Sequence, residues 1–187
     1  MQYKQLRAFV SPTPIQLTSI PKSADAEEKV LEKLHSFFAN ENKTQLQPDT
    51  LALTTEEINH LIRTSESLSA LKLDYHLELE ETTLVARNSL PSSHLIGVLS
   101  LLSKVLRVEG YLNSEMEANL TFEKDEIKLM PLAAKMNGLD APVSVLNRKG
   151  GVDLSEWIAD QGFYHLVLSR LQAVQIRHAQ VLLIKKP

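Results

Sequence analysis

Histidine is the side chain of this chain best suited to binding a metal or moving a proton. The six histidines lie at positions 35, 60, 76, 94, 165 and 178. None forms a His-x-x-x-His or Glu-flanked pair that would place two ligands on one helix face. His76 could meet a carboxylate from a neighbouring strand, whereas Glu78, two residues on, is as readily solvated. The pattern favours structural or surface histidines over a metal site.

Carboxylate pairs for acid/base catalysis are also absent from the sequence pattern. The acidic pairs are contiguous, so in a helix or a strand their side chains diverge, and they lie at positions 27–28, 56–57 and 80–81. No Gly-x-Ser-x-Gly nucleophile elbow occurs, and Lys149-Gly150-Gly151 is too short for a phosphate-binding loop. An enzyme would need a site assembled from scattered His and Glu residues, and we expect no catalytic activity and no cofactor.

Composition narrows the classes of protein further. The 187 residues are the usual size of one domain and enough to bury a substantial core. A formal net charge of -3, with acidic and basic residues interspersed, does not build the positive surface that nucleic-acid binding requires. The absence of cysteine excludes disulfides, thiol catalysis and thiolate metal sites. We therefore expect a protein that does not bind nucleic acid as its main partner.

The first 22 residues are predicted to form an extended N-terminal arm, followed by one α+β domain over residues 23–187. Prolines at positions 12, 14 and 21 disfavour helix in the arm. A helix over residues 25–39 follows, with an apolar stripe of Val30, Leu31, Leu34, Phe37 and Phe38. Leu51 and Leu53 alternate as a short strand. Thr54 and Glu57 then form a capping box for a helix that buries Ile58, Leu61 and Ile62.

The middle of the chain is dominated by alternation. Residues 71–80, LKLDYHLELE, place apolar or aromatic side chains at every odd position, and residues 83–87 are predicted to complete a hairpin. Residues 92–106 fit a helix better than a strand, although strand remains open. Residues 106–122 alternate over a length that a strand can sustain only if it curls or breaks. Gly110 is a natural place for a bend or a bulge, and Pro131 marks an edge or a bulge.

The C-terminal third mixes turns, helix and a last hairpin. Asn137-Gly138 and Lys149–Gly151 predict turns. Asp153 and Glu156 cap a predicted short helix carrying Trp157 and Ile158, and helical spacing continues at positions 163, 166, 167, 171 and 174. Strands around 174–176 and 180–185 are predicted to close the chain about a turn at 177–179.

The alternating strands contain many apolar side chains and no catalytic motif, so a hydrophobic site is the best candidate. A curved sheet could fill that surface with its own helices, or it could leave an apolar groove for a ligand. The residues expected to line such a groove by excluding water are Leu73, Tyr75, Leu77, Leu112, Met116, Leu120, Met136 and Trp157. Alternation indicates which residues share a face and does not indicate which face is inside.

The order of segments resembles a known family. The segments LALTTEEINHLI, PLAAKMNGLDAPVSVL, LSEWI and a terminal V-x-I to V-x-L-x-I hairpin are similar to those of bacterial half-barrel proteins of the tubular lipid-binding superfamily, over roughly residues 51–185. The resemblance implies a curled antiparallel sheet wrapped around a helix, an apolar tunnel or groove for lipid-like molecules, and no catalysis. It also implies a location outside the cytoplasm, such as the periplasm.

The chain departs from that family in lacking a lipobox cysteine and a signal sequence. No uninterrupted run of about 7 to 15 apolar residues occurs near the start, and nowhere do about 18 run together. A signal removed before residue 1 would leave the same pattern. Export is therefore an expectation that depends on such processing, and peripheral membrane contact is an expectation with it.

Taken together, the sequence predicts an α+β fold: a long, strongly curved, mostly antiparallel sheet packed on and around amphipathic helices as a half-barrel. The leading functional hypothesis is non-enzymatic binding of a lipid or acyl chain between sheet and helices. The alternative is a structural or protein-interaction module with a filled core, which docks a partner through a sheet edge or an apolar patch.

Overall fold

The computed structural model describes residues 10–17, 23–39, 50–64, 74–92, 109–147, 150–154 and 168–186. Its elements follow the chain in this order: α2 (Ala24–Ala39), β1 (Thr50–Thr54), α3 (Thr55–Thr64), β2 (Asp74–Leu79), β3 (Leu84–Pro91), β4 (Tyr111–Glu123), β5 (Glu126–Met136), β6 (Leu139–Asp140), α6 (Ser144–Asn147), β7 (Val152–Asp153), β8 (Leu171–Arg177) and β9 (Gln180–Lys185).

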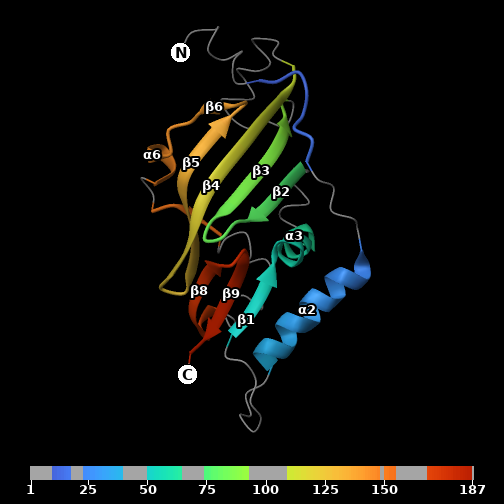
Figure 1. The fold of residues 1–187 in the computed structure, drawn as a ribbon, viewed down its shortest axis with the longest axis vertical. Helices are drawn as coiled ribbons and strands as arrows, with labels where there is room; N and C mark the ends of the chain where they lie inside the picture. The colour runs from blue at the N-terminus through green and yellow to red at the C-terminus, as the bar shows by residue number, and fades with distance from the viewer. Residues whose placement is uncertain are drawn as a thin grey trace.

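Two antiparallel sheets organise these elements into an α+β fold (Figure 1). The larger sheet has the strand order β2-β3-β4-β5-β6, with β7 also pairing with β5. The smaller sheet has the order β1-β9-β8. The larger sheet is open rather than closed into a barrel. The α+β class and the antiparallel pairing predicted from the sequence are confirmed.

The long central hairpin contains the irregularities expected of it. β4 spans 13 residues and β5 spans 11. Gly110 comes directly before β4 with a φ of 143°, and the β4–β5 register shifts between Glu117 and Ala118. Glu117 pairs with Ala133 and Ala118 with Pro131, so Leu132 is the extra residue of a bulge next to the proline. Of the alternatives predicted from the sequence, the structure has a bend at Gly110 and a bulge beside Pro131.

Helix α3 begins at the predicted capping box. The backbone N–H of Glu57 donates to Thr54 Oγ1 at 3.3 Å, and the N–H of Thr54 donates to Glu57 Oε2 at 2.8 Å. The prediction of its buried residues is corrected. Ile58, Leu61 and Ile62 are only partly buried, whereas Asn59 and His60 are 1% and 2% exposed. Both polar residues are buried because the helix packs against the edge of β2 and against α2.

The helical spacing predicted through positions 171 and 174 is wrong, because both residues belong to strand β8. The β8–β9 register shifts between Leu171 and Ala173, and the added residue lets Leu171 and Val174 both be buried despite their spacing of three. Asp153 lies in β7, and the Leu154 N–H that follows donates to Ile127 C=O at 2.9 Å. Glu156, Trp157 and Ile158 lie outside the described residues, as does the predicted helix over 92–106 apart from Ser92.

The predicted turns at 137–138 and 177–179 are confirmed. Asn137 and Gly138 have φ values of 48° and 79°, and His178 and Ala179 have values of 52° and 56°. This left-handed conformation suits the tight turns between twisted antiparallel strands. At Ala179 it is unfavourable for the side chain, whereas at Gly138 it is not.

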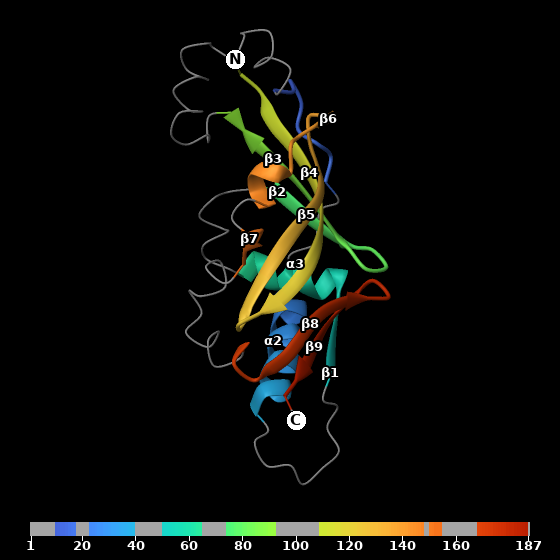
Figure 2. The same cartoon turned by 90° about the vertical axis from the view of Figure 1, so that its left-hand side faces the viewer.

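The hydrophobic core lies where one end of the larger sheet meets the smaller sheet and the helices (Figure 2). α2 contributes Phe37 and Phe38, whose rings meet edge to face at 4.8 Å between centroids. The smaller sheet contributes one face, made of Leu51, Leu53, Val174, Ile176, Val181 and Leu183. The larger sheet closes this core from above in the orientation of Figure 1.

Candidate functional site

The residues predicted to bind a ligand share one face of the larger sheet wherever the structure describes them. Tyr75 and Leu77 of β2, Leu112, Met116 and Leu120 of β4, and Met136 of β5 all lie on this face by strand register. We call it the apolar face. One row of cross-strand neighbours, for example, runs Leu77, Ala86, Met116, Ala134. Leu73 and Trp157 lie outside the described residues.

The proximal part of the apolar face, near the smaller sheet, is filled by the protein itself. Its residues Leu79, Leu84, Ala118, Ile127 and Leu129 are at most 9% exposed and belong to the main core cluster. The predicted ligand-binding residues Leu77, Met116 and Leu120 pack against the same cluster. For these three side chains the structure favours a core role over contact with a ligand.

The distal part of the apolar face lies at the opposite end of β3, β4 and β5. It consists of Tyr75, Leu90, Leu112 and Met136, which are partly exposed and are not among the described residues that form or pack against the core cluster. Three of the predicted residues, Tyr75, Leu112 and Met136, therefore occupy a part of the sheet with different surroundings from Met116.

A polar pair that the sequence analysis did not single out interrupts the distal part. Asn88 and Ser114 lie in one cross-strand row with Tyr75 and Met136, and Ser114 Oγ donates to Asn88 Oδ1 at 2.6 Å. The alternation contained a signal for it, because Asn88 and Ser114 occupy positions of apolar parity in β3 and β4. A ligand against this part of the sheet would meet apolar side chains with one hydrogen-bonding pair among them.

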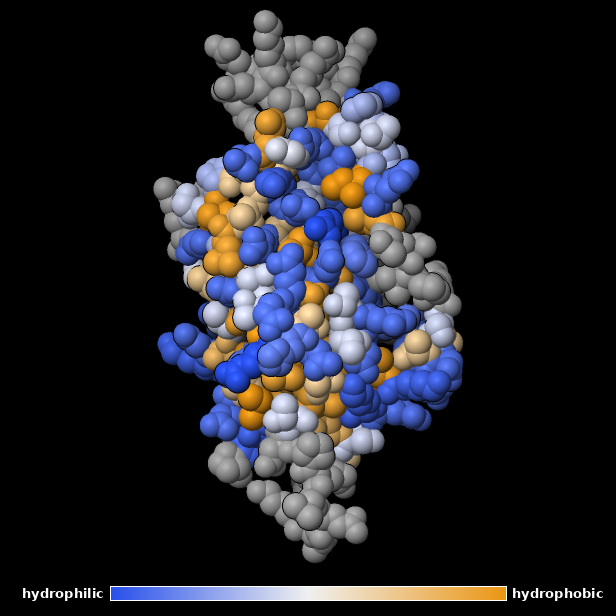
Figure 3. Space-filling view, in the orientation of Figure 1, coloured by the Kyte–Doolittle hydropathy of each residue, from blue (hydrophilic) through white to orange (hydrophobic). Residues whose placement is uncertain are grey.

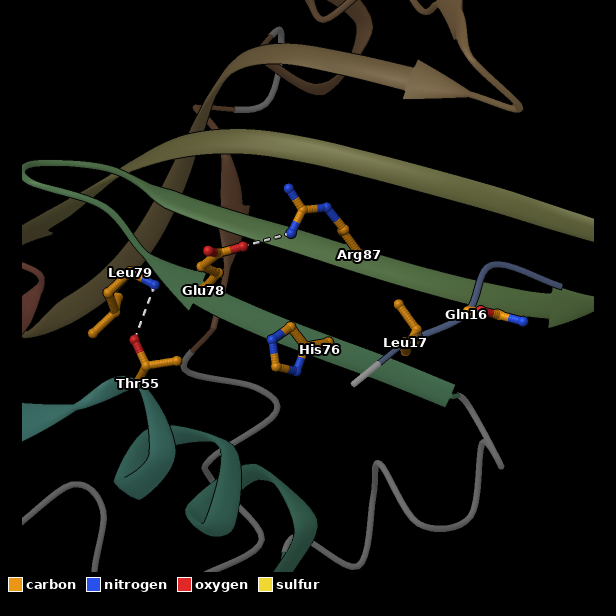
Figure 4. A pocket seen from close by; sticks show the side chains of 7 residues that line it. All are labelled: Gln16, Leu17, Thr55, His76, Glu78, Leu79 and Arg87. Carbon is orange, nitrogen blue, oxygen red and sulfur yellow. Dashed lines mark hydrogen bonds and ion pairs between the residues drawn. The ribbon is translucent and has the colours of Figure 1, made fainter. Parts of the chain in front are cut away.

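The opposite, polar face carries a pocket that sequence reasoning did not predict (Figure 4). Its volume is about 380 Å³, and its lining residues are Gln16, Leu17, Thr55, His76, Glu78, Leu79 and Arg87. In the space-filling view of Figure 3, side chains over β3 to β5 are mainly hydrophilic. The pocket lies between the N-terminal arm and the β2–β3 pair.

Arg87 sets the electrostatics of this pocket. It donates from Nη1 to Glu78 Oε2 at 2.6 Å and from Nε to Glu115 Oε2 at 2.7 Å. The hydrogen bond to Glu115, followed by that to Glu78, holds the pKa of Arg87 above its ordinary value. His76 sits opposite Arg87 in the β2–β3 register, not opposite a carboxylate. Of the two carboxylates that accept from Arg87, Glu78 lines the pocket and Glu115 does not.

The arm crosses the polar face beyond this pocket. Ser11 and Tyr111 form an antiparallel bridge in which each N–H donates to the other C=O, at 2.8 and 2.7 Å. The Ile15 N–H donates to Asn113 Oδ1 at 3.2 Å, and Asn113 Nδ2 donates to the Thr13 C=O at 3.0 Å. Residues 11–17 contain no helix: an isolated bridge residue at Ser11 is followed by bends at Pro12 and Thr13.

Side-chain amides occupy backbone groups at two edges of the larger sheet. At the β2 edge, Asn59 Nδ2 donates to the Leu77 C=O at 2.7 Å, and the Leu77 N–H donates to Asn59 Oδ1 at 2.9 Å. The Leu79 N–H donates to Thr55 Oγ1 at 3.1 Å. Beside β5, Asn147 Nδ2 donates to the Pro131 C=O at 3.1 Å. A partner strand could not pair at these positions without displacing the amides.

Within the described ranges, no group of three or more His, Asp or Glu residues is placed to hold a metal ion. No described helix is both long and apolar enough to cross a membrane. Comparisons of the chain with protein-family models, with curated proteins and with solved structures find no match.

Proposed function

We propose that this chain is a non-enzymatic binding protein for a hydrophobic ligand, a lipid or an acyl chain, held against the distal part of the apolar face. One observation carries the proposal: the apolar face continues through Leu90, Leu112 and Met136 beyond the core cluster that covers its proximal part. Apolar side chains that remain partly exposed gain about 25 cal/mol for each Å² that a ligand removes from water.

The distal part also suggests the character of the ligand. Leu112 and Leu90 are direct cross-strand neighbours, and the next row on this face contains Asn88 and Ser114. Met136 adds a side chain that adapts to irregular shapes. An amphipathic molecule, with an acyl chain along the leucines and a polar group at the Asn88–Ser114 pair, would satisfy both rows.

The family resemblance supports the same proposal at the level of pattern. Half-barrel curvature of the larger sheet, a location outside the cytoplasm and peripheral contact with a membrane belong to the proposal. The long β4–β5 hairpin with its bulge at Leu132 supports curvature, because bulges increase local bending and twist.

Native mass spectrometry of the freshly purified protein tests the proposal, followed by organic extraction of any released compound. We expect an added mass that disappears on denaturation and proves to be a lipid or acyl compound. The double variant Leu112→Ala with Met136→Ala should lose that mass while remaining folded. The matched control, Leu132→Ala, alters an exposed apolar side chain at the β5 bulge, outside the distal part, and should retain it. Equal retention by all three proteins, or a bare protein mass after expression with abundant lipid, would contradict the proposal.

A protein-interaction module is the second candidate, favoured by a separate observation. Leu132 at the β5 bulge and Leu139 in β6 are 49% and 45% exposed, the large apolar side chains most open to water in the described chain. Exposed apolar side chains of this kind can contact a partner. If the chain elutes as a stable oligomer that Leu132→Ser with Leu139→Ser converts to monomer, and no ligand is extracted, this candidate replaces the first.

A further inference from the structure

The N-terminal arm is seated on the polar face as a peptide sits on a recognition surface. Residues 10–17 have no helical structure and only one bridge residue, Ser11. The contacts that hold the arm are backbone hydrogen bonds to Tyr111 and to the side chain of Asn113. We call the surface formed by Ser89, Gly110, Tyr111 and Asn113 the arm groove.

Asn113 recognises the extended backbone of the arm. A primary amide offers one acceptor and one donor side by side, and here they engage the N–H of Ile15 and the C=O of Thr13, two residues apart. Asn113 is 7% exposed, and Ser89, 2% exposed, donates to its Oδ1 at 2.8 Å. Asn137 bonds both backbone groups of Asn113: its N–H donates to the Asn113 C=O at 2.8 Å, and its Oδ1 accepts from the Asn113 N–H at 3.1 Å. The amide is thus oriented before any peptide arrives, which lowers the entropic cost of binding.

Gly110 makes the close approach of the arm feasible. A Cβ at this position would lie 2.3 Å from the Ser11 carbonyl oxygen and 2.8 Å from Val10 Cγ1. A side chain on residue 110 would therefore push the arm off the groove. The φ of 143° is also one that other residues rarely adopt. A glycine with no room for a Cβ and with a positive φ is typical of a site where a second stretch of backbone approaches closely.

The groove demands little of the side chains of the arm. Pro12, Thr13, Pro14 and Gln16 are exposed, while Ile15 and Leu17 are partly buried. Proline suits the two positions it occupies because it favours an extended chain and needs no partner for an N–H. Any segment of the pattern Ser-Pro-x-Pro-aliphatic-x-aliphatic could make the same hydrogen bonds, and its last two residues would lie over the pocket between the arm and Arg87.

We propose that the arm groove is a peptide-recognition site that the chain's own arm occupies in cis, and that its partner is an extended, proline-containing segment of another protein. The tether holds the arm at an effective concentration of the order of millimolar, so the arm competes with any peptide in solution. The apparent affinity for an added peptide is proportional to the fraction of molecules whose groove is open, so it is low when the arm occupies most grooves. The arm therefore acts as a built-in inhibitor of the site.

The test uses the full chain and a fluorescently labelled synthetic peptide with the sequence of residues 10–17. Ile15→Pro removes the arm's N–H to Asn113 and leaves every groove residue unchanged. Fluorescence anisotropy should show the peptide binding to this variant at least tenfold more tightly than to the wild type. The matched control, Gln16→Pro, introduces the same residue at a neighbouring exposed position and should bind as the wild type does.

A second substitution tests the groove itself. Asn113→Asp in the Ile15→Pro background keeps the shape of the side chain but replaces the Nδ2 donor with a carboxylate oxygen facing the peptide carbonyl. Peptide affinity should fall at least tenfold. Asn119→Asp makes the same change at an exposed position of the same strand and face, and should not alter binding.

Equal binding of the peptide to wild type and to folded Ile15→Pro, or no binding to either, would overturn the proposal and make the arm a structural strap. If Ile15→Pro does not fold, Tyr111→Cys provides the test, because the chain has no cysteine of its own. A peptide carrying cysteine at the place of Ser11 should then form a mixed disulfide, since bridge partners lie within disulfide reach. Failure to do so, or disulfide-linked dimers between Ser11→Cys and Tyr111→Cys chains instead, would refute a foreign partner.

Discussion

The proximal and distal parts of the apolar face belong to the same strands and the same alternation, yet their surroundings differ. Ala118 and Leu129 in the proximal part are 0% and 5% exposed, with α2, α3 and the smaller sheet in the same core. Leu112 and Met136 in the distal part are partly exposed on the same strands. Alternation therefore selects a face, whereas the elements that reach that face decide whether it becomes core.

The sharpest test of this difference is a pair of leucine truncations. Leu129→Ala should lower the free energy of unfolding by about 2 to 5 kcal/mol, because it leaves a cavity in close packing. Leu112→Ala should cost well under half as much, because its side chain is partly exposed already. Urea denaturation followed by circular dichroism measures both. Equal costs would mean that the distal part is as fully packed as the proximal part.

Asn59 connects the helix over the proximal part to the strand edge beside it. Asn59→Ala removes both hydrogen bonds to Leu77 and leaves the backbone N–H and C=O of Leu77 without those partners. We therefore expect the free energy of unfolding to fall by about 2 to 3 kcal/mol. Exposure of this edge should also promote aggregation. Thermal unfolding and light scattering report the two effects. Glu56→Ala, on the solvent side of the same helix, is the control and should change little; a similarly small effect of Asn59→Ala would show that the edge is sealed by other contacts.

Glu57 of α3 makes the stability of the protein depend on pH through its contact with Lys33 of α2. Partial burial by itself would raise the pKa of Glu57, but the hydrogen bond from Lys33 Nζ at 2.7 Å, the Thr54 hydrogen bonds and the positive charge of Lys33 outweigh it, so the pKa lies below its ordinary value. A depressed carboxyl pKa stabilises the fold above the unfolded-state pKa, and that stability is lost as the pH falls through the folded-state pKa.

Stability of the wild type should therefore decrease as the pH falls from about 5 to 3, and part of that decrease should vanish in Glu57→Gln. At pH 7 the same substitution should cost about 1 kcal/mol, because it weakens the capping box and the ion pair with Lys33. Denaturant titrations across this pH range, with Glu80→Gln as an exposed control, measure both effects. Parallel pH profiles for wild type and Glu57→Gln would contradict the assignment.

The smallest expected effect concerns the β8–β9 turn of the smaller sheet. Ala179→Gly should stabilise the protein by about 0.5 to 1 kcal/mol, because Ala179 has a φ of 56° that favours glycine. Ala133→Gly, at an exposed strand position, should instead destabilise it. If the smaller sheet supports only the proximal part, Ala179→Gly should leave hydrogen exchange near Leu112 unchanged.

Local patterns predicted several elements accurately because their physical causes are local. The capping box at Thr54 and Glu57, the turn at Asn137-Gly138 and the bulge beside Pro131 each follow from a few neighbouring residues. The prediction through Leu171 and Val174 was wrong because a bulge imitates helical spacing, and nothing local reveals where a strand inserts one residue. The described residues among those predicted to bind a ligand share one face, as the alternation indicates, yet alternation did not separate Met116 from Leu112.

Period and residue type are enough to indicate which side chains share a face, where the chain turns and which catalytic motifs the sequence lacks. The packing of sheets and helices accounts for the rest: Asn59 seals the edge of β2, the arm docks on Asn113, and Leu77, Met116 and Leu120 pack against the core cluster. Contacts between residues far apart in the chain depend on how the two sheets and the helices pack, and no local pattern contains that information.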